Sequence, residues 1–156
     1  GSNPQRLTTN EVLDTSPTVS PSGQQIAFVT EQYGAPQIAI MNADGTNMRR
    51  VSYQGGSAYD PVWSPDGRSI AYAANRGGEG FQIFILDIAS GDTRRLTSAR
   101  NNESPSWSAD SRHVVFSTTR RGKPELWTVN IETGEQNPVP LIDMRSEGPT
   151  WGPRRE

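Results

Sequence analysis

The sequence predicts an all-β protein built as three blades of a β-propeller. Pro17, Pro61, Pro105 and Pro149 recur at a constant spacing of 44 residues. Within each unit, short apolar runs alternate with turn residues, and no run shows the 3.6-residue period of an amphipathic helix. A repeat of about 40–45 residues with four short strands is typical of propeller blades. We therefore expect four-stranded antiparallel blades that form part of a propeller.

The first and second strands of each unit flank a tight turn. The clearest copy of this turn is Ser64-Pro65-Asp66-Gly67, where proline presets φ and glycine accepts a positive φ. The second strand is apolar on both faces, as in the run Ile70-Ala71-Tyr72-Ala73. A sheet with one solvated face would alternate apolar with polar residues, so this strand should be covered on both faces. Six side chains are thus expected to be buried between blades: Ile26, Phe28, Ile70, Tyr72, Val114 and Phe116.

The third and fourth strands are joined by a second kind of turn. The third strands begin at Gln37, Gln82 and Glu125, and the fourth strands end at Val51, Leu96 and Val139. Between them lie the segments ADGT, ASGD and ETGE, at 43–46, 89–92 and 132–135. Each has a glycine in its third position, as a hairpin turn requires.

The repeat also predicts the boundaries of the units. They are an N-terminal segment at 1–15, three blades at 16–59, 60–103 and 104–147, and a tail at 148–156. The N-terminal segment should hold a lone fourth strand at Gln5–Thr9, and the tail a lone first strand at Gly148–Gly152. Propellers typically have about four to eight blades, so three blades with surplus strands indicate a piece of a larger ring.

Composition excludes several classes of function. The chain has 15 basic and 17 acidic residues, so no positive charge favours nucleic acid, and no apolar run is long enough to cross a membrane. It has no cysteine, and His113 is its only histidine. No Gly-x-Ser-x-Gly elbow and no phosphate-binding glycine loop is present. We expect no catalytic residue, no metal site and no cofactor, and hence no enzyme.

The stretch Pro61-x-Trp63-Ser64-Pro65-Asp66-Gly67, followed by Ile70-Ala71-Tyr72, resembles the repeat of the TolB-like β-propeller family. This resemblance covers the chain from about Leu7 to Gly152, although Val19 replaces the tryptophan in the first unit. It implies a periplasmic or secreted scaffold that binds a protein or peptide, in the Tol–Pal system a Pal-like lipoprotein. Similar blades occur in prolyl-oligopeptidase-like peptidases and in sensor proteins, which remain alternatives.

One face of the blades differs between units and is the expected binding surface. It carries the loops from second to third strand and from fourth strand to the next first strand; we call it the loop face. Only these loops vary in length, and variable loops usually meet partners. Tyrosine and arginine, which are favoured in interfaces, occur among its residues. The candidate binding residues are Tyr33, Tyr59, Asp60, Arg76, Glu79, Arg100, Asn101, Asn102, Glu103, Arg120, Lys123, Arg145 and Glu147.

The two ends of the array predict self-association. A terminal blade exposes an apolar face that a neighbouring blade would normally cover, and such faces promote association. Two-fold pairing would cover both ends of each chain at once. We therefore expect a homodimer in which each chain contributes three blades. Higher closed rings, or a compact monomer whose end strands cap its own faces, are the alternatives.

Overall fold

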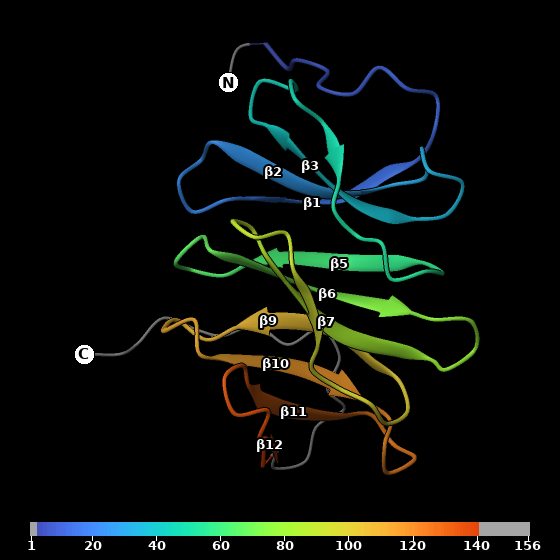
Figure 1. Cartoon of the computed structure of the whole chain (residues 1–156), viewed down its shortest axis with the longest axis vertical. Coiled ribbons are helices and arrows are strands. Elements are labelled where there is room, and N and C mark those ends of the chain that lie inside the picture. Colours follow the sequence, from blue (N-terminus) through green and yellow to red (C-terminus); the bar gives the residue numbers. More distant parts are fainter. Residues whose placement is uncertain (1–2, 141–156) are drawn as a thin grey trace.

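Residues 3–140 are described by the computed structural model, which contains twelve strands in three four-stranded antiparallel sheets. The sheets stack in chain order along the long axis of the molecule (Figure 1). The predicted fold class, three propeller-type blades, is confirmed. No segment in this part of the chain forms a helix long and apolar enough to span a membrane.

In each blade the strands follow one another in space as they do in sequence. The first blade consists of β1 (Asp14–Val19), β2 (Gln25–Thr30), β3 (Gln37–Asn42) and β4 (Arg49–Arg50). The second consists of β5 (Ala58–Trp63), β6 (Ser69–Asn75), β7 (Phe81–Asp87) and β8 (Thr93–Arg95). The third consists of β9 (Asn102–Trp107), β10 (His113–Thr118), β11 (Glu125–Asn130) and β12 (Gln136–Pro138).

The turn between the first two strands forms even where its sequence departs from the repeat. In the third blade Ser111 stands in the place of Gly67 and adopts the left-handed conformation itself, with φ of 59°. The Ser108 hydroxyl donates to the Asp110 carboxylate at 2.6 Å, and this hydrogen bond holds the pKa of Asp110 below its ordinary value. The Ser111 hydroxyl also accepts the backbone N–H of Asp66, at 3.1 Å, and so links the turns of two blades.

Two apolar cores lie between the blades. The first joins one face of β2 and β3 to β5, β6 and β7, and Tyr72 stacks on Phe84 within it. The second joins the other face of β6 and β7 to Trp107, Val114 and Phe116 of the third blade. The side chains of β6 alternate between these cores, which explains why this strand is apolar on both faces.

Burial follows the prediction wherever a second blade is present. Ile70, Tyr72, Val114 and Phe116 are fully buried between blades. Phe28 is also buried but lies on the outer face of the first blade, and Ile26 beside it is only half-buried. No neighbouring blade covers these two side chains among residues 3–140, because the N-terminal segment supplies Leu7 instead of a whole sheet.

The N-terminal segment differs from the prediction. Residues 3–13 form no strand, so the lone strand expected at Gln5–Thr9 is absent. A fourth strand normally pairs with the third strand of its own blade, and this segment has no such partner in the described chain. It runs instead across the first blade (Figure 1), where Leu7 approaches Gly45. The first strand expected at Gly148–Gly152 lies outside the described residues.

Two tryptophans join successive blades through hydrogen bonds. The indole N–H of Trp63 donates to the Thr18 carbonyl at 3.2 Å, and that of Trp107 donates to the Val62 carbonyl at 3.0 Å. Each acceptor belongs to the first strand of the preceding blade. Both indoles are buried, whereas Val19, at the matching position of the first blade, is 57% exposed. These tryptophans therefore belong to the blade-to-blade packing and not to a ligand cage.

Candidate functional site

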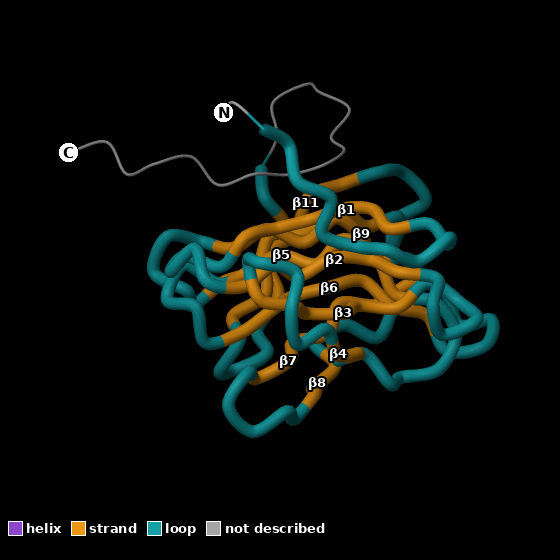
Figure 2. Tube along the Cα trace, turned by 90° about the horizontal axis from the view of Figure 1, so that it is seen from above, coloured by secondary structure: helices purple, strands orange, loops and turns teal. Residues whose placement is uncertain are grey.

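The loop face lies at the ends of the strands where the longer connections emerge. Because the strands are antiparallel, the loops between β2 and β3, β6 and β7, and β10 and β11 share one end with the loops that lead into β5 and β9. Loops gather at both ends of the strands in Figure 2. The end opposite the loop face carries the short turns between first and second strands and between third and fourth strands. Neighbouring first strands, β1 with β5 and β5 with β9, contact each other, so the blades converge along the edge formed by their first strands.

A strained bulge shapes each first strand near the loop face. The pairing of the first strand with the second shifts register at this point in all three blades. The residues that precede the repeated prolines, Ser16, Asp60 and Ser104, all have positive φ, from 51° to 53°. Such a conformation is unfavourable for a residue with a side chain, and strained backbone of this kind is concentrated at functional sites.

A hollow of about 380 Å³ opens beside two of these bulges. Its lining consists of Tyr59, Asp60, Ala73, Phe81, Glu103 and Ser104. The rings of Tyr59 and Phe81 meet edge to face, with their centroids 5.7 Å apart. The hollow thus lies between the second and third blades and unites three of the predicted binding residues, Tyr59, Asp60 and Glu103.

The lining of this hollow combines aromatic rings with carboxylates. Asp60 is exposed, and Tyr59, Phe81 and Glu103 are half-buried, so a ligand can reach all four. Aromatic faces and carboxylates both attract cations, and a lysine or arginine side chain satisfies both at once. The arrangement is suited to receive one long basic side chain.

Two predicted binding residues are used inside the protein. Asn102 is fully buried, and its amide donates to the Gln82 side chain at 2.9 Å and to the Ala99 carbonyl at 2.8 Å. Arg120 is half-buried, lies 4.1 Å from the Trp127 ring centroid and donates to Gln136 at 2.7 Å. Asn102 is therefore buried and does not belong to the candidate surface. Arg120 serves mainly to hold the third blade together.

The other predicted residues lie on loops, and most of them are exposed. Asn101 accepts the backbone N–H of Phe81 at 3.0 Å, and Glu79 pairs with Arg95 at 3.2 Å. Tyr33 is half-buried, while the remaining described candidates, Arg76, Arg100 and Lys123, are exposed. Arg145 and Glu147 lie outside the described residues.

Sequence reasoning missed an arginine and a tyrosine on the same face. Arg50 lies close to two rings, with its guanidinium carbon 5.5 Å from the centroid of Tyr33 and 4.8 Å from that of Tyr53. Tyr53 is 68% exposed, unusually so for a large ring. A comparison of the units offers a signal, because Tyr53 stands where the second unit has Ser98.

A repeated hydrogen-bond network holds the loops that enter the second and third blades. The Ser52 hydroxyl accepts the Ile38 N–H at 2.8 Å and donates to Gln37 at 2.7 Å, and the Gln37 amide donates to the Gly56 carbonyl at 2.6 Å. In the second blade Gln82 and Thr97 make the equivalent bonds. The loops of the loop face are therefore held by buried side chains.

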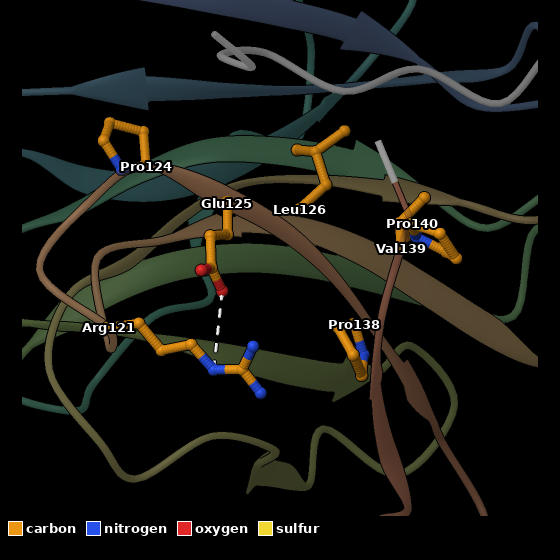
Figure 3. A pocket seen from close by; sticks show the side chains of 7 residues that line it. All are labelled: Arg121, Pro124, Glu125, Leu126, Pro138, Val139 and Pro140. Atoms are coloured by element: carbon orange, nitrogen blue, oxygen red, sulfur yellow. Dashed lines mark ion pairs between the residues drawn. The ribbon is translucent and has the colours of Figure 1, made fainter. Parts of the chain in front are cut away.

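The third blade lacks this network. Glu125 and Pro140 occupy the positions of the glutamine and the hydroxyl residue, and a shallow hollow of about 310 Å³ lies there (Figure 3). Glu125 faces Arg121 across 3.9 Å and accepts the Trp127 indole N–H at 3.0 Å. Prolines and a weak exposed ion pair line this hollow, so it offers few free polar groups to a ligand.

Within residues 3–140, no three histidine or acidic side chains lie close enough together to hold a metal ion. His113 is half-buried, and its Nε2 lies 3.2 Å from the Asn130 amide.

The chain matches the family model described as TolB beta propeller domain over residues 1–155. It is 34% identical to a "Protein TolB homolog" of Chlorobium luteolum, over 86% of this chain and 30% of that protein. It is 31% identical to the "Tol-Pal system protein TolB" of Gluconobacter oxydans, over 64% of this chain and 22% of that protein. The chain thus spans less than a third of the length of these curated relatives.

Solved structures share the fold. The TolB structure from Acinetobacter baumannii matches with a TM-score of 0.77 at 22% identity, over 90% of this chain and 35% of that chain. The β-propeller domain of the Trilobed protease from Pyrococcus furiosus matches with a TM-score of 0.66 at 24% identity, over 83% and 43%. At such identities the likeness concerns the fold alone.

Proposed function

The chain belongs to the TolB β-propeller domain family, and from this premise we propose that it is a non-catalytic scaffold that binds a protein partner through its loop face. The observation that carries the proposal is the hollow between the second and third blades. It joins Tyr59 and Phe81 to the carboxylates of Asp60 and Glu103 beside two strained bulges. Aromatic anchors near exposed charges are typical of the energetic centre of a protein interface.

We infer the chemistry of the partner from this hollow. A lysine or arginine side chain of the partner would enter it, with its charge near the carboxylates and its aliphatic part against the rings. The name of the Gluconobacter relative points to the Tol–Pal system, so the candidate partner is a Pal-like lipoprotein. The same relationship supports a periplasmic or secreted location.

The binding proposal is tested by isothermal titration calorimetry with the soluble domain of the Pal-like lipoprotein from the same organism. Glu103→Gln removes a charge from the hollow at constant size and should weaken binding about fivefold to tenfold. Glu132→Gln is the matched control, because Glu132 is exposed in the turn between β11 and β12, on the opposite side. Equal affinities of the two variants would refute the role of the hollow, and no binding by the unmodified chain would refute the choice of partner.

The alternative is the propeller domain of a peptidase, since the same fold occurs in the propeller domain of the Trilobed protease. In that case the hydrolytic residues would belong to another domain of the parent protein. A hydrolase domain bearing a Gly-x-Ser-x-Gly elbow in the parent gene would favour this alternative.

We also propose that the chain forms a homodimer. On the outer face of the first blade Phe28, Ala39 and Met41 are buried, but Leu7, Ile26 and Met48 around them are only half-buried and leave apolar surface exposed. Covering apolar surface contributes about 25 cal/mol per Å² and favours association. Light scattering on dilute protein should give twice the 17.1 kDa mass of one chain, and a mass near 17.1 kDa would refute the dimer.

A further inference from the structure

Arg50 combines a fixed position with unused hydrogen-bonding capacity. Its Nε donates to the Ser52 carbonyl, and its guanidinium carbon lies over the rings of both Tyr33 and Tyr53. The Tyr53 hydroxyl donates to the Arg50 carbonyl at 2.8 Å, which fixes the exposed ring over the arginine. Among residues 3–140, no hydrogen-bond or ion-pair partner meets the terminal nitrogens of this guanidinium.

The second blade shows what such an arginine binds. Arg95 occupies the position of Arg50, and its Nε donates to the Thr97 carbonyl at 2.6 Å, as that of Arg50 does to Ser52. Its terminal Nη1 lies 3.2 Å from the Glu79 carboxylate, which comes from the loop between β6 and β7. The same anchored arginine therefore has an internal carboxylate in one blade and none in the other.

The corresponding loop of the first blade cannot supply this carboxylate as it stands. It carries Tyr33, and its only acid, Glu31, makes no ion pair with Arg50. A second cation, Arg76, donates to the side chain of Gln54, the residue that follows Tyr53. The loop that carries Tyr53 therefore meets two arginines, Arg50 and Arg76.

From this comparison of blades we propose that Arg50, which lies close to the rings of Tyr33 and Tyr53, binds a carboxylate of an acidic segment of the partner protein. A guanidinium presents paired N–H donors that match the two oxygens of a carboxylate, and its Nε anchor and neighbouring rings hold it in place. The identity of that partner rests on the function proposed above, but the carboxylate site itself does not. Arg50 would then bind an acidic group of the partner, and the hollow with Asp60 and Glu103 would bind a basic one.

The test is a titration of the ¹⁵N-labelled full chain, followed by NMR at the Nε–Hε signals of the arginines. The probe is acetylated, amidated pentaglutamate, and pentaglutamine is its uncharged match. The Arg50 signal should shift with pentaglutamate and not with pentaglutamine. Arg50→Gln should weaken binding about fivefold, the factor expected for one exposed ion pair. Arg49→Gln, at the exposed neighbouring position on β4, should leave binding unchanged.

Two further variants sharpen the result. Arg50→Lys keeps the charge but loses the Nε anchor, so it should also bind pentaglutamate more weakly. Glu79→Gln uncovers Arg95, whose signal should then respond to pentaglutamate as that of Arg50 does. The proposal is overturned if the Arg50 signal does not shift with pentaglutamate, whether or not it shifts with inorganic phosphate at equal concentration. Because no partner protein takes part, failure here is distinguishable from failure of the Pal titration.

Discussion

Replacing Trp107 by alanine should lower the free energy of unfolding by about 3–5 kcal/mol. Trp107 is 5% exposed and packs in the core between the second and third blades. A buried tryptophan removes about 200 Å² from water, which at about 25 cal/mol per Å² amounts to about 5 kcal/mol. The alanine methyl group keeps a small part of that burial, and the indole bond to the Val62 carbonyl is lost as well.

Two companion variants separate packing from hydrogen bonding. Trp107→Phe keeps a ring in the core but loses the N–H donor, so it should cost about 1–2 kcal/mol. Val19→Ala changes the matching position of the first blade, where the side chain is 57% exposed, and should stay within about 0.5 kcal/mol. Urea unfolding followed by circular dichroism measures all three. A loss below about 1 kcal/mol for Trp107→Ala would refute the blade-to-blade role of the indole.

Two other predictions concern the buried phenol of Tyr72 and the close approach of Gly56 to Asn75. Burial raises the pKa of the Tyr72 phenol to about 12, because its desolvation outweighs the opposing influence of the Thr93 side chain and of Arg76. The folded state therefore favours the neutral phenol, so stability is full below the ordinary pKa near 10 and falls as pH rises towards 12. Urea titrations should show that the free energy of unfolding falls by about 2 kcal/mol between about pH 8 and pH 11.5, and Tyr72→Phe should abolish this fall. An equal fall in the Tyr72→Phe variant would contradict the prediction. Gly56→Ala should destabilise more than Gly55→Ala. Both glycines have positive φ, but only a Cβ at Gly56 would meet the Asn75 carbonyl, at 2.5 Å. Equal unfolding midpoints of the two variants would count against that close approach.

The blades could be predicted because every level of the sequence agrees on them. The repeated prolines and the doubly apolar second strands recur every 44 residues, and each unit has a turn glycine between its third and fourth strands. The prediction was wrong for Gln5–Thr9, because a strand needs a pairing partner as well as a strand-like sequence. Ile26 is less buried than Ile70 for a related reason: its side chain has the repeat pattern, but no blade covers it.

The loop face was harder to derive than the fold. Its location followed from loop lengths, and Tyr59, Asp60 and Glu103 do line one hollow. Asn102, however, is polar and was expected on the surface, but it is fully buried. Its side-chain amide donates a hydrogen bond to the Gln82 side chain inside the protein. Arg50 could not be recognised from its type alone, since its significance depends on which rings and carboxylates surround it in space.

The tryptophan bonds between blades have a consequence for how such arrays change over time. The donor is a particular side chain, whereas the acceptor is a backbone carbonyl that every residue type possesses. Thr18 and Val62 differ in size and polarity, yet each accepts the indole of the following blade. The second and third blades thus each carry the donor, and each uses a backbone acceptor in the blade before it. For this hydrogen bond, a duplicated or exchanged blade that carries the tryptophan needs no matching substitution in the blade that receives it.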